Sequence, residues 1–418
     1  MGLPFRSLTL AAGLVASLSV PGAAQDLLGH GGPVGALALE GARALSGGFD
    51  TRAILWDVET GAAHTVTRFH DGNVTAVALF PDGRFATAGQ DGRIALWHPG
   101  ARVPDLATGH GVSAIAALAL SPDGARLAAG FWDGTISVLD VASGAVAQAQ
   151  GHADRVTGLG YLASGDLVSV GSDLRFVRWG PDMTLAARAD LPDLPNGLAI
   201  SNDRVAVVFA EGALRLFSPD GVLLPERFLT DRPLVSVASS SDGVAAGAID
   251  GSVWMLEPAE LTERFRIEAA QGPVWALATR GALLLSAGAD GAIRRWSARD
   301  GTAQGTGNST ARTDFDDGSR GAEVWRACAV CHSLDPEDQS RAGPSLHGIF
   351  GQRIATQPGF EYSEALQALD IVWTPRTVAE LFEFGPETYT PGSRMPEQRI
   401  ASESDRQALV EFIARASR

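Results

Sequence analysis

Cys328-Ala329-Val330-Cys331-His332 is the stretch around which this chain of 418 residues is organised. On a helical turn, two thiols three positions apart lie on one face, and an imidazole follows at once. This spacing predicts covalent attachment of a c-type haem, with the sulfurs beside its vinyl groups and the imidazole at its iron. A redox dithiol and half of a zinc site are the alternatives. The sequence contains two cysteines, so no second pair exists to complete a zinc site.

A methionine supplies a candidate second ligand for the iron. Met395 stands in the proline-braced loop Pro391-Gly392-Ser393-Arg394-Met395-Pro396. Iron held by a histidine and a methionine is the usual pairing in cytochromes c, where the thioether raises the reduction potential. We therefore expect His332 and Met395 to be the metal ligands.

Residues 317–418 resemble a class I cytochrome c, an all-α domain. The residues that match are Gly321, Trp325, the Cys328–His332 motif, the stretch 343–351, Tyr362, Trp373 and the Met395 loop. The resemblance implies one covalent haem c, bound through Cys328 and Cys331, with His332 and Met395 on its iron. It also implies that the carbonyl of Pro344 accepts the second N–H of His332, which would fix the ring orientation. In the same way, Tyr362 and Trp373 would donate to a buried haem propionate, and Ser393 would lie near it.

Three positions depart from the family pattern. Gln352 stands where many relatives place an arginine near the propionates. Leu366 and Phe382 stand where mitochondrial relatives bury an asparagine and a tyrosine that share one hydrogen-bond network. Losing both polar groups together leaves no orphaned partner. We therefore expect a drier distal side.

A repeat dominates the chain from about residue 26 to residue 300. A turn acid precedes a large apolar residue by six positions in seven places: Asp50 and Trp56, Asp91 and Trp97, Asp133 and Leu139, Asp173 and Trp179, Glu211 and Phe217, Asp250 and Leu256, Asp290 and Trp296. Trp56 and Trp296 are 240 residues and six repeats apart, so the mean period is 40. Strand-rich units with this period are typical of WD40 propellers. We predict a seven-bladed all-β propeller over residues 25–300, followed by the all-α cytochrome c domain over 317–418.

In the WD40 family a His, a Ser or Thr, the turn Asp and the Trp form a buried tetrad within a blade. The residues that match it here are His30, Ser46, Asp50 and Trp56; His70, Thr87, Asp91 and Trp97; and His152, Ser169, Asp173 and Trp179. The third unit keeps His110 and Asp133 but has lost the other two members. We expect His30, His70, His110 and His152 to be structural core residues, each in its own blade, and not metal ligands. The segment from Asp26 to Leu28 is expected to pair into the last blade and close the ring.

The segments before and after the propeller differ from its repeats in composition. Arg6 precedes an apolar run from Leu8 to Val20, and small residues up to Ala24 supply a cleavage site. Residues 1–24 are therefore expected to be a signal peptide, cleaved after Ala24 on export to the periplasm. The small, polar residues of the 301–316 segment predict a flexible linker. It would let the haem domain move relative to the propeller unless an interface fixes it.

The net charge and the expected coordination of the iron limit the functions that we expect. The net charge of −15 argues against nucleic acid and anionic membranes as partners. We expect an electron carrier, not an enzyme, because six-coordinate iron leaves no open position for a substrate; its propeller would dock a redox partner protein of unknown identity. Two alternatives stay open: a catalytic propeller with its own cofactor that uses the haem as a relay, and a haem-based assembly or sensing protein. Candidate contact residues on the propeller are Phe49, Gln90, Trp132 and Trp275, with ordinary packing as the simpler explanation.

Overall fold

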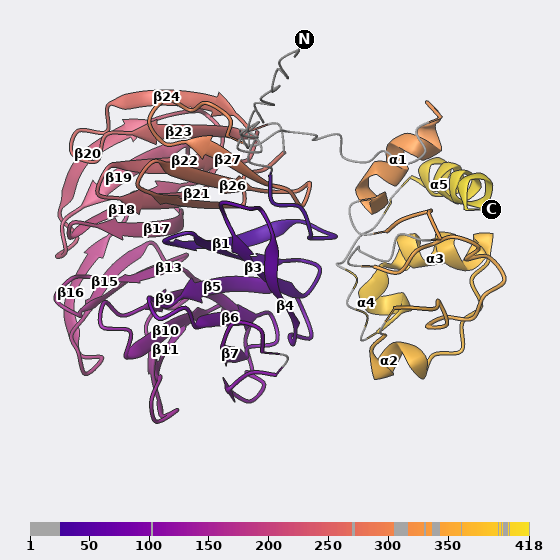
Figure 1. The fold of residues 1–418 in the computed structure, drawn as a ribbon, viewed down its shortest axis with the longest axis horizontal. Helices are drawn as coiled ribbons and strands as arrows, with labels where there is room; N and C mark the ends of the chain where they lie inside the picture. Colours follow the sequence, from indigo (N-terminus) through magenta and orange to yellow (C-terminus); the bar gives the residue numbers. More distant parts are fainter. Residues whose placement is uncertain are drawn as a thin grey trace, which may run out of the picture.

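The computed structural model describes residues 26–101, 103–269, 272–304, 317–329, 332–336, 343–360, 362–391, 393, 395, 400 and 402–417. These residues form a ring of β-sheets followed by a smaller helical domain (Figure 1). The segment expected to be a signal peptide, most of the expected linker, and Cys331 lie outside the described residues.

Seven antiparallel sheets make up the ring within the described residues, as the 40-residue repeat predicts. The second strand of each blade is buried along almost its whole length, and turns with a residue at positive φ join the second and third strands. Blade 1 contains β1 (Val34–Glu40), β2 (Arg43–Gly48), β3 (Arg52–Asp57) and β4 (Ala63–Arg68), and blade 2 contains β5 (Val74–Leu79), β6 (Phe85–Gly89), β7 (Ile94–Trp97) and β8 (Leu106–Ala107). Blade 3 contains β9 (Ile115–Leu120), β10 (Arg126–Phe131), β11 (Thr135–Asp140) and β12 (Val146–Gln150), and blade 4 contains β13 (Val156–Tyr161), β14 (Leu167–Gly171), β15 (Arg175–Trp179) and β16 (Leu185–Asp190). Blade 5 contains β17 (Pro195–Ser201), β18 (Arg204–Phe209), β19 (Ala213–Phe217) and β20 (Leu223–Phe228), blade 6 contains β21 (Leu234–Ser240), β22 (Gly243–Ala248), β23 (Ser252–Leu256) and β24 (Glu263–Glu268), and blade 7 contains β25 (Ala276–Arg280), β26 (Leu283–Ala287) and β27 (Ile293–Ser297).

The start of the propeller closes the ring by pairing with its last blade, as expected. Leu27 and Ile293 exchange both backbone hydrogen bonds, at 3.0 and 3.1 Å. Leu27 is fully buried in the apolar cluster between the last and first blades. The pairing covers an edge of β27 that would otherwise present unpaired backbone groups to solvent.

Buried tetrads hold blades 1, 2 and 4 together. In blade 1 the Nε2 atom of His30 lies 2.7 Å from the hydroxyl of Ser46, which also accepts the indole N–H of Trp56 at 2.8 Å. The Nδ1 atom of His30 lies 3.0 Å from the carboxylate of Asp50. The same contacts recur in the expected residues of blades 2 and 4. These histidines are therefore structural, because both ring nitrogens serve the hydrogen-bond chain of their own blade.

His110 departs from the prediction. Its side chain is 64% exposed and lies 3.6 Å from Asp71 of the neighbouring unit. The equivalents of the tetrad Ser and Trp in blade 3 are Ala129 and Leu139, which offer no hydroxyl or indole N–H. Without those partners, burial of the imidazole would leave its nitrogens unsatisfied. The ring therefore stays in solvent.

The helical domain contains α1 (Arg320–Ala329), α2 (Glu364–Gln367), α3 (Pro375–Phe384), α4 (Pro386–Tyr389) and α5 (Glu403–Ala416). The hydroxyls of Thr374 and Ser402 cap α3 and α5. α1 and α5 cross closely at Gly321, where an added Cβ would lie 2.3 Å from the carbonyl oxygen of Ala408. No described helix is long and apolar enough to span a bilayer.

We expect His152→Ala to lower the free energy of unfolding of the propeller by about 1–3 kcal/mol, because Ser169 and Asp173 lose buried partners. Urea unfolding followed by tryptophan fluorescence measures the change. His110→Ala is the matched control, since the same truncation at an exposed side chain changes stability by no more than about 0.5 kcal/mol. Equal shifts of the two midpoints would contradict the structural role of the tetrad.

Candidate functional site

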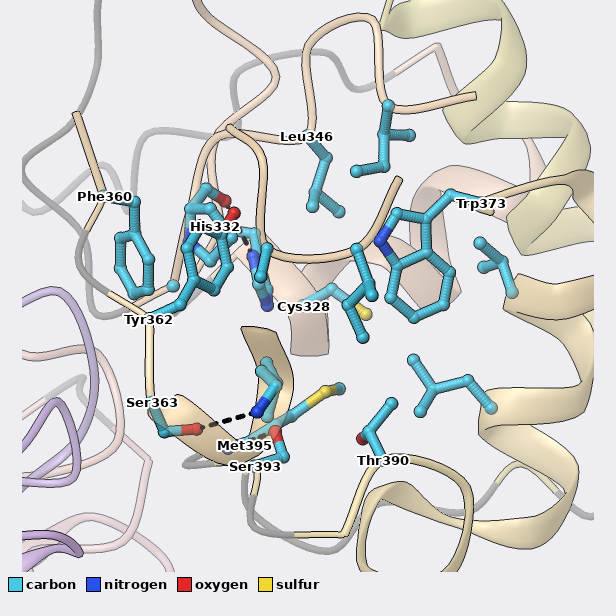
Figure 2. A pocket seen from close by; sticks show the side chains of 18 of the residues that line it. Cys328, His332, Leu346, Phe360, Tyr362, Ser363, Trp373, Thr390, Ser393 and Met395 are labelled. Atoms are coloured by element: carbon cyan, nitrogen blue, oxygen red, sulfur yellow. Dashed lines mark hydrogen bonds between the residues drawn. The ribbon is translucent and has the colours of Figure 1, made fainter. Parts of the chain in front are cut away.

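A deep cleft runs through the helical domain and collects most of the residues singled out in the sequence. It encloses about 1370 Å³, counting the solvent at its mouth, and its walls include Cys328, His332, Tyr362, Trp373 and Met395. Figure 2 shows His332 and Cys328 on one side of the space and Met395 on the opposite side. The cleft therefore places an imidazole and a thioether on facing walls.

The first wall begins at the end of α1. Cys328 is buried there, and the amide of His332 donates to the carbonyl of Cys328 at 2.9 Å. Residues four apart lie on one helical face, so the thiol and the imidazole share the side that faces the cleft. Cys331 lies outside the described residues, and its role remains a prediction.

The orientation of the His332 ring is set by the segment that follows. Its Nδ1 atom lies 2.8 Å from the carbonyl oxygen of Pro344, the contact that the sequence led us to expect. With Nδ1 donating to that carbonyl, Nε2 is the nitrogen that an iron would take, and the hydrogen bond raises its basicity. Gly343 packs against the ring face, where a Cβ would lie 2.3 Å from Cε1 of His332. Glycine at this position is therefore a steric requirement of the imidazole.

A buried serine braces the loop that carries Pro344. The hydroxyl of Ser345 donates to the carbonyl of Asp335 at 2.8 Å and accepts the amide of His347 at 3.2 Å. The amide of Leu346 donates to the carbonyl of Ser333 at 2.7 Å. These bonds tie the segment after His332 to the segment around Pro344, so the carbonyl and the imidazole move together.

The second wall is the loop after α4. The hydroxyl of Ser393 accepts the amide of Met395 at 3.1 Å, and the amide of Ser393 donates to the carbonyl of Thr390 at 3.0 Å. Both Ser393 and Met395 line the cleft. The predicted positions of Ser393 and Met395 therefore meet in one turn, with the thioether directed at the space that His332 faces (Figure 2).

Two aromatic residues with polar atoms stand along the remaining walls. Burial raises the pKa of Tyr362 to about 12, against an opposing contribution from the backbone of Gln357, so the hydroxyl stays protonated at neutral pH. Trp373 is held by two backbone bonds of 2.8 Å, from its own amide to Gln352 and from the amide of Gly351 to its carbonyl. Both side chains can act as hydrogen-bond donors toward an anionic group in the cleft, the role expected of them.

The distal part of the wall is apolar. Leu366 and Phe382 both line the cleft, and Phe382 packs with Val378 and Leu381 in the core of the helical domain. These side chains carry no polar atoms. The drier distal side that the two substitutions indicate stays a prediction.

The residues present fit a covalently attached haem. A haem needs a large apolar cleft, two axial donors on opposite faces, a thiol at its edge and donors for its carboxylates. His332 and Met395, Cys328, and Tyr362 with Trp373 supply these features in one cleft.

Some residues at this cleft were not singled out in the sequence. Gly343 and Ser345 belong to a matched stretch, but only the structure reveals what each of them contacts. Thr51 and Arg68 of the propeller also line the cleft, together with Phe49 and Asp50. The sequence had marked Phe49 as a candidate contact residue and Asp50 as a tetrad member. No local pattern could place any of the four at the cleft, because more than 250 residues separate them from the haem motif.

Comparisons with known proteins agree with both domains. Residues 318–417 match the family model described as cytochrome c, and residues 63–98 and 104–140 match the WD domain, G-beta repeat. Cytochrome c of Stellaria longipes is 35% identical over 98 residues, which cover 23% of this chain and 90% of that protein. Cytochrome c2 of Blastochloris viridis is 34% identical over 106 residues, covering 25% of this chain and 80% of that protein. A crystal structure of the computationally designed Ika8 protein matches with a TM-score of 0.53 and 22% identity, over 65% of this chain and 99% of that one, which shows a likeness of fold.

We expect Gly343→Ala to displace the imidazole of His332 and to reduce the fraction of six-coordinate, low-spin haem. Overpacking of this kind costs about 1–3 kcal/mol. We expect it to weaken both the bond from His332 to the iron and the packing of the loop that contains Gly343. Absorption spectra of the oxidised and reduced protein measure the change. Gly109→Ala is the control, since a Cβ there meets nothing within 4 Å. An unaltered spectrum in the Gly343 variant would contradict the steric account.

Proposed function

This chain belongs, through its C-terminal domain, to the cytochrome c family, and from that premise we propose that it is a periplasmic one-electron carrier whose WD40 propeller docks a redox partner protein. The observation that supports the proposal is a pair of facing side chains: His332, whose Nδ1 lies 2.8 Å from the carbonyl of Pro344, and Met395 across the cleft. When bound, haem c supplies the iron(III)/iron(II) couple, and the polypeptide tunes it.

The chain's own groups have distinct tasks in this proposal. Cys328 and Cys331 hold the haem covalently, so the carrier keeps its cofactor in a dilute compartment. His332 and Met395 occupy both axial positions, which disfavours binding of a substrate to the iron and favours simple electron transfer. The apolar wall around Phe382 excludes water and lowers the local dielectric. Tyr362, Trp373 and Ser393 stabilise a propionate by hydrogen bonds.

Charge narrows the class of partner. Residues 314–418 contain 17 acidic and 10 basic residues, a net charge of −7 before the haem carboxylates are counted. Mitochondrial cytochromes surround the haem edge with lysines, and partners selected by such a ring would be repelled here. The natural partner is therefore expected to present basic or neutral groups to this domain.

The propeller offers aromatic contact residues for such a partner. Trp132 is 42% exposed, and the guanidinium of Arg155 stacks over its ring at 4.7 Å. Trp275 is 37% exposed. Exposed tryptophan and arginine are the residues that most often dominate binding at protein interfaces. Both features support a docking role for the propeller.

Met395→Ala is expected to abolish the weak long-wavelength band of iron(III) bound to sulfur and to lower the midpoint potential, because the thioether ligand raises it. Absorption spectroscopy and potentiometric titration of the full chain, exported with a haem-attachment system, measure both. Met183→Ala in the propeller is the control. We expect one covalent haem per chain. A second chromophore would favour a catalytic propeller. An unchanged spectrum in the Met395→Ala variant would exclude Met395 as a ligand.

The periplasmic location makes a separate prediction. Mass spectrometry of the mature protein is expected to find Gln25 at its N-terminus, because cleavage follows Ala24. A variant that begins with an initiator methionine directly before Gln25 is expected to stay in the cytoplasm without covalent haem. Recovery of haem-loaded protein from that variant, or an intact leader on the exported chain, would contradict the assignment.

A further inference from the structure

The cleft that fits the haem is lined by both domains. Phe49, Asp50 and Thr51 of the β2–β3 turn and Arg68 at the end of β4 form part of its wall, together with Tyr362 and Ser363. The helical domain lies beside blade 1 in Figure 1. In Figure 2, the purple ribbons of the propeller approach on the side of Tyr362 and Ser363.

We propose that blade 1 of the propeller is the internal docking partner of the cytochrome domain: its β2–β3 turn covers the mouth of the haem cleft, and Arg68 supplies a positive charge beside the haem carboxylates. This inference rests on the proposed function in one respect, namely that haem occupies the cleft. It goes further by assigning one face of the propeller to the chain's own haem domain. An external partner would then use other parts of the propeller rim.

Phe49 provides an apolar cover at the mouth. Its amide donates to the carbonyl of Pro33 at 2.8 Å, and its ring lies over Gly35, where an added Cβ would approach Cε1 to 3.1 Å. The half-buried ring is thus held at the rim of the blade, on a cleft wall that it shares with Phe360 and Leu366. Contact between these side chains would remove apolar surface of both domains from water.

Comparison of the repeats shows that the turn of blade 1 differs from its copies. The residue after the turn acid has positive φ in all seven turns; it is Thr51 in blade 1, Leu174 in blade 4, and glycine in the rest, namely Gly92, Gly134, Gly212, Gly251 and Gly291. A β-branched residue at φ 63° is strained, and such strain persists where the surroundings favour it. Thr51 is 6% exposed, whereas Leu174 is 40% exposed. The turn that faces the cleft is therefore covered, and the other non-glycine turn is not.

Charge at the edge of blade 1 points to an anion. Arg52 and Arg68 are directly opposite each other on β3 and β4. Like charges at such a position are destabilising. Burial together with the field of Arg68 lowers the pKa of Arg52, although Asp50, 3.9 Å from Arg52, opposes that shift. A carboxylate of the haem would relieve this repulsion. The cytochrome domain has Gln352 where many relatives place an arginine near the propionates. The adjacent Arg353 donates to the carbonyl of Leu369 and lies 3.5 Å from Asp370, so Arg68 would supply the positive charge instead.

Docking is tested by a photo-crosslinker placed at the rim. Phe49→p-benzoylphenylalanine in the full haem-loaded chain is expected to crosslink within the same molecule to peptides that contain residues 343–366. Trp132→p-benzoylphenylalanine is the matched control, because Trp132 also precedes the turn acid of its blade but does not line the cleft. Mass spectrometry of the digested monomer identifies the products. Equal yields from both positions, or none from position 49, would overturn the docking.

The charge is tested by potentiometry. Arg68→Gln is expected to lower the midpoint potential, with a larger shift at low ionic strength, because a nearby cation favours the reduced haem. Arg188→Gln, on the outer strand of blade 4, is the control and is expected to leave the potential unchanged. Equal potentials for the wild type and Arg68→Gln would overturn the role of Arg68. If the spectrum indicates His and Met ligation but the crosslinking fails, the proposed electron-carrier function stands and the proposed internal docking is rejected.

Discussion

The hydrogen bond between Nδ1 of His332 and the carbonyl of Pro344 is the contact on which the cytochrome domain depends. An imidazole that serves a metal must present one nitrogen in one direction, and a fixed acceptor on the other nitrogen achieves this. The surrounding structure keeps that acceptor in place. Ser345 ties the Pro344 segment to Asp335, and the absence of a side chain at Gly343 leaves room for the ring. The same demand for close approach recurs at Gly321, where α1 meets α5 and sets the position of Cys328.

In the propeller, one hydrogen-bond chain recurs in several blades, although the residues that form it are not present in every blade. Blades 1, 2 and 4 bury a charged turn acid, and each acid has a histidine within 3.0 Å that connects it to the tryptophan through a hydroxyl. Blade 7 retains the last link alone, from Trp296 to Ser286 at 2.8 Å. Where the hydroxyl is missing, as in blade 3, the histidine leaves the core. A half-formed buried network costs more than an apolar one, so an imidazole that lacks its partners is more stable in solvent.

Features set by neighbours in sequence could be predicted, and those set by distant partners could not. The haem motif and the 40-residue period follow from spacing and side-chain chemistry, and the tetrads follow from the resemblance to the WD40 family. His110 was assigned wrongly because its position matched the repeat, while its fate depended on the side chains at 129 and 139. The steric role of Gly343 and the approach of Arg68 to the cleft depend on tertiary packing across tens or hundreds of residues. Spacing alone contains no information about such contacts.

A small interface between the domains is physically sufficient because they share one chain. Two separate proteins usually need about 1200–2000 Å² of buried surface for a stable complex. A short flexible linker, as the composition of residues 301–316 predicts, gives an effective concentration on the order of millimolar. A contact worth only about 4 kcal/mol, equivalent to a dissociation constant of about 1 mM, would then be half populated. The required interaction free energy from Phe49, Thr51 and Arg68 together is therefore no larger than this value. An interface of that strength covers the haem cleft only part of the time, so an external partner bound to another part of the propeller rim can still reach the haem.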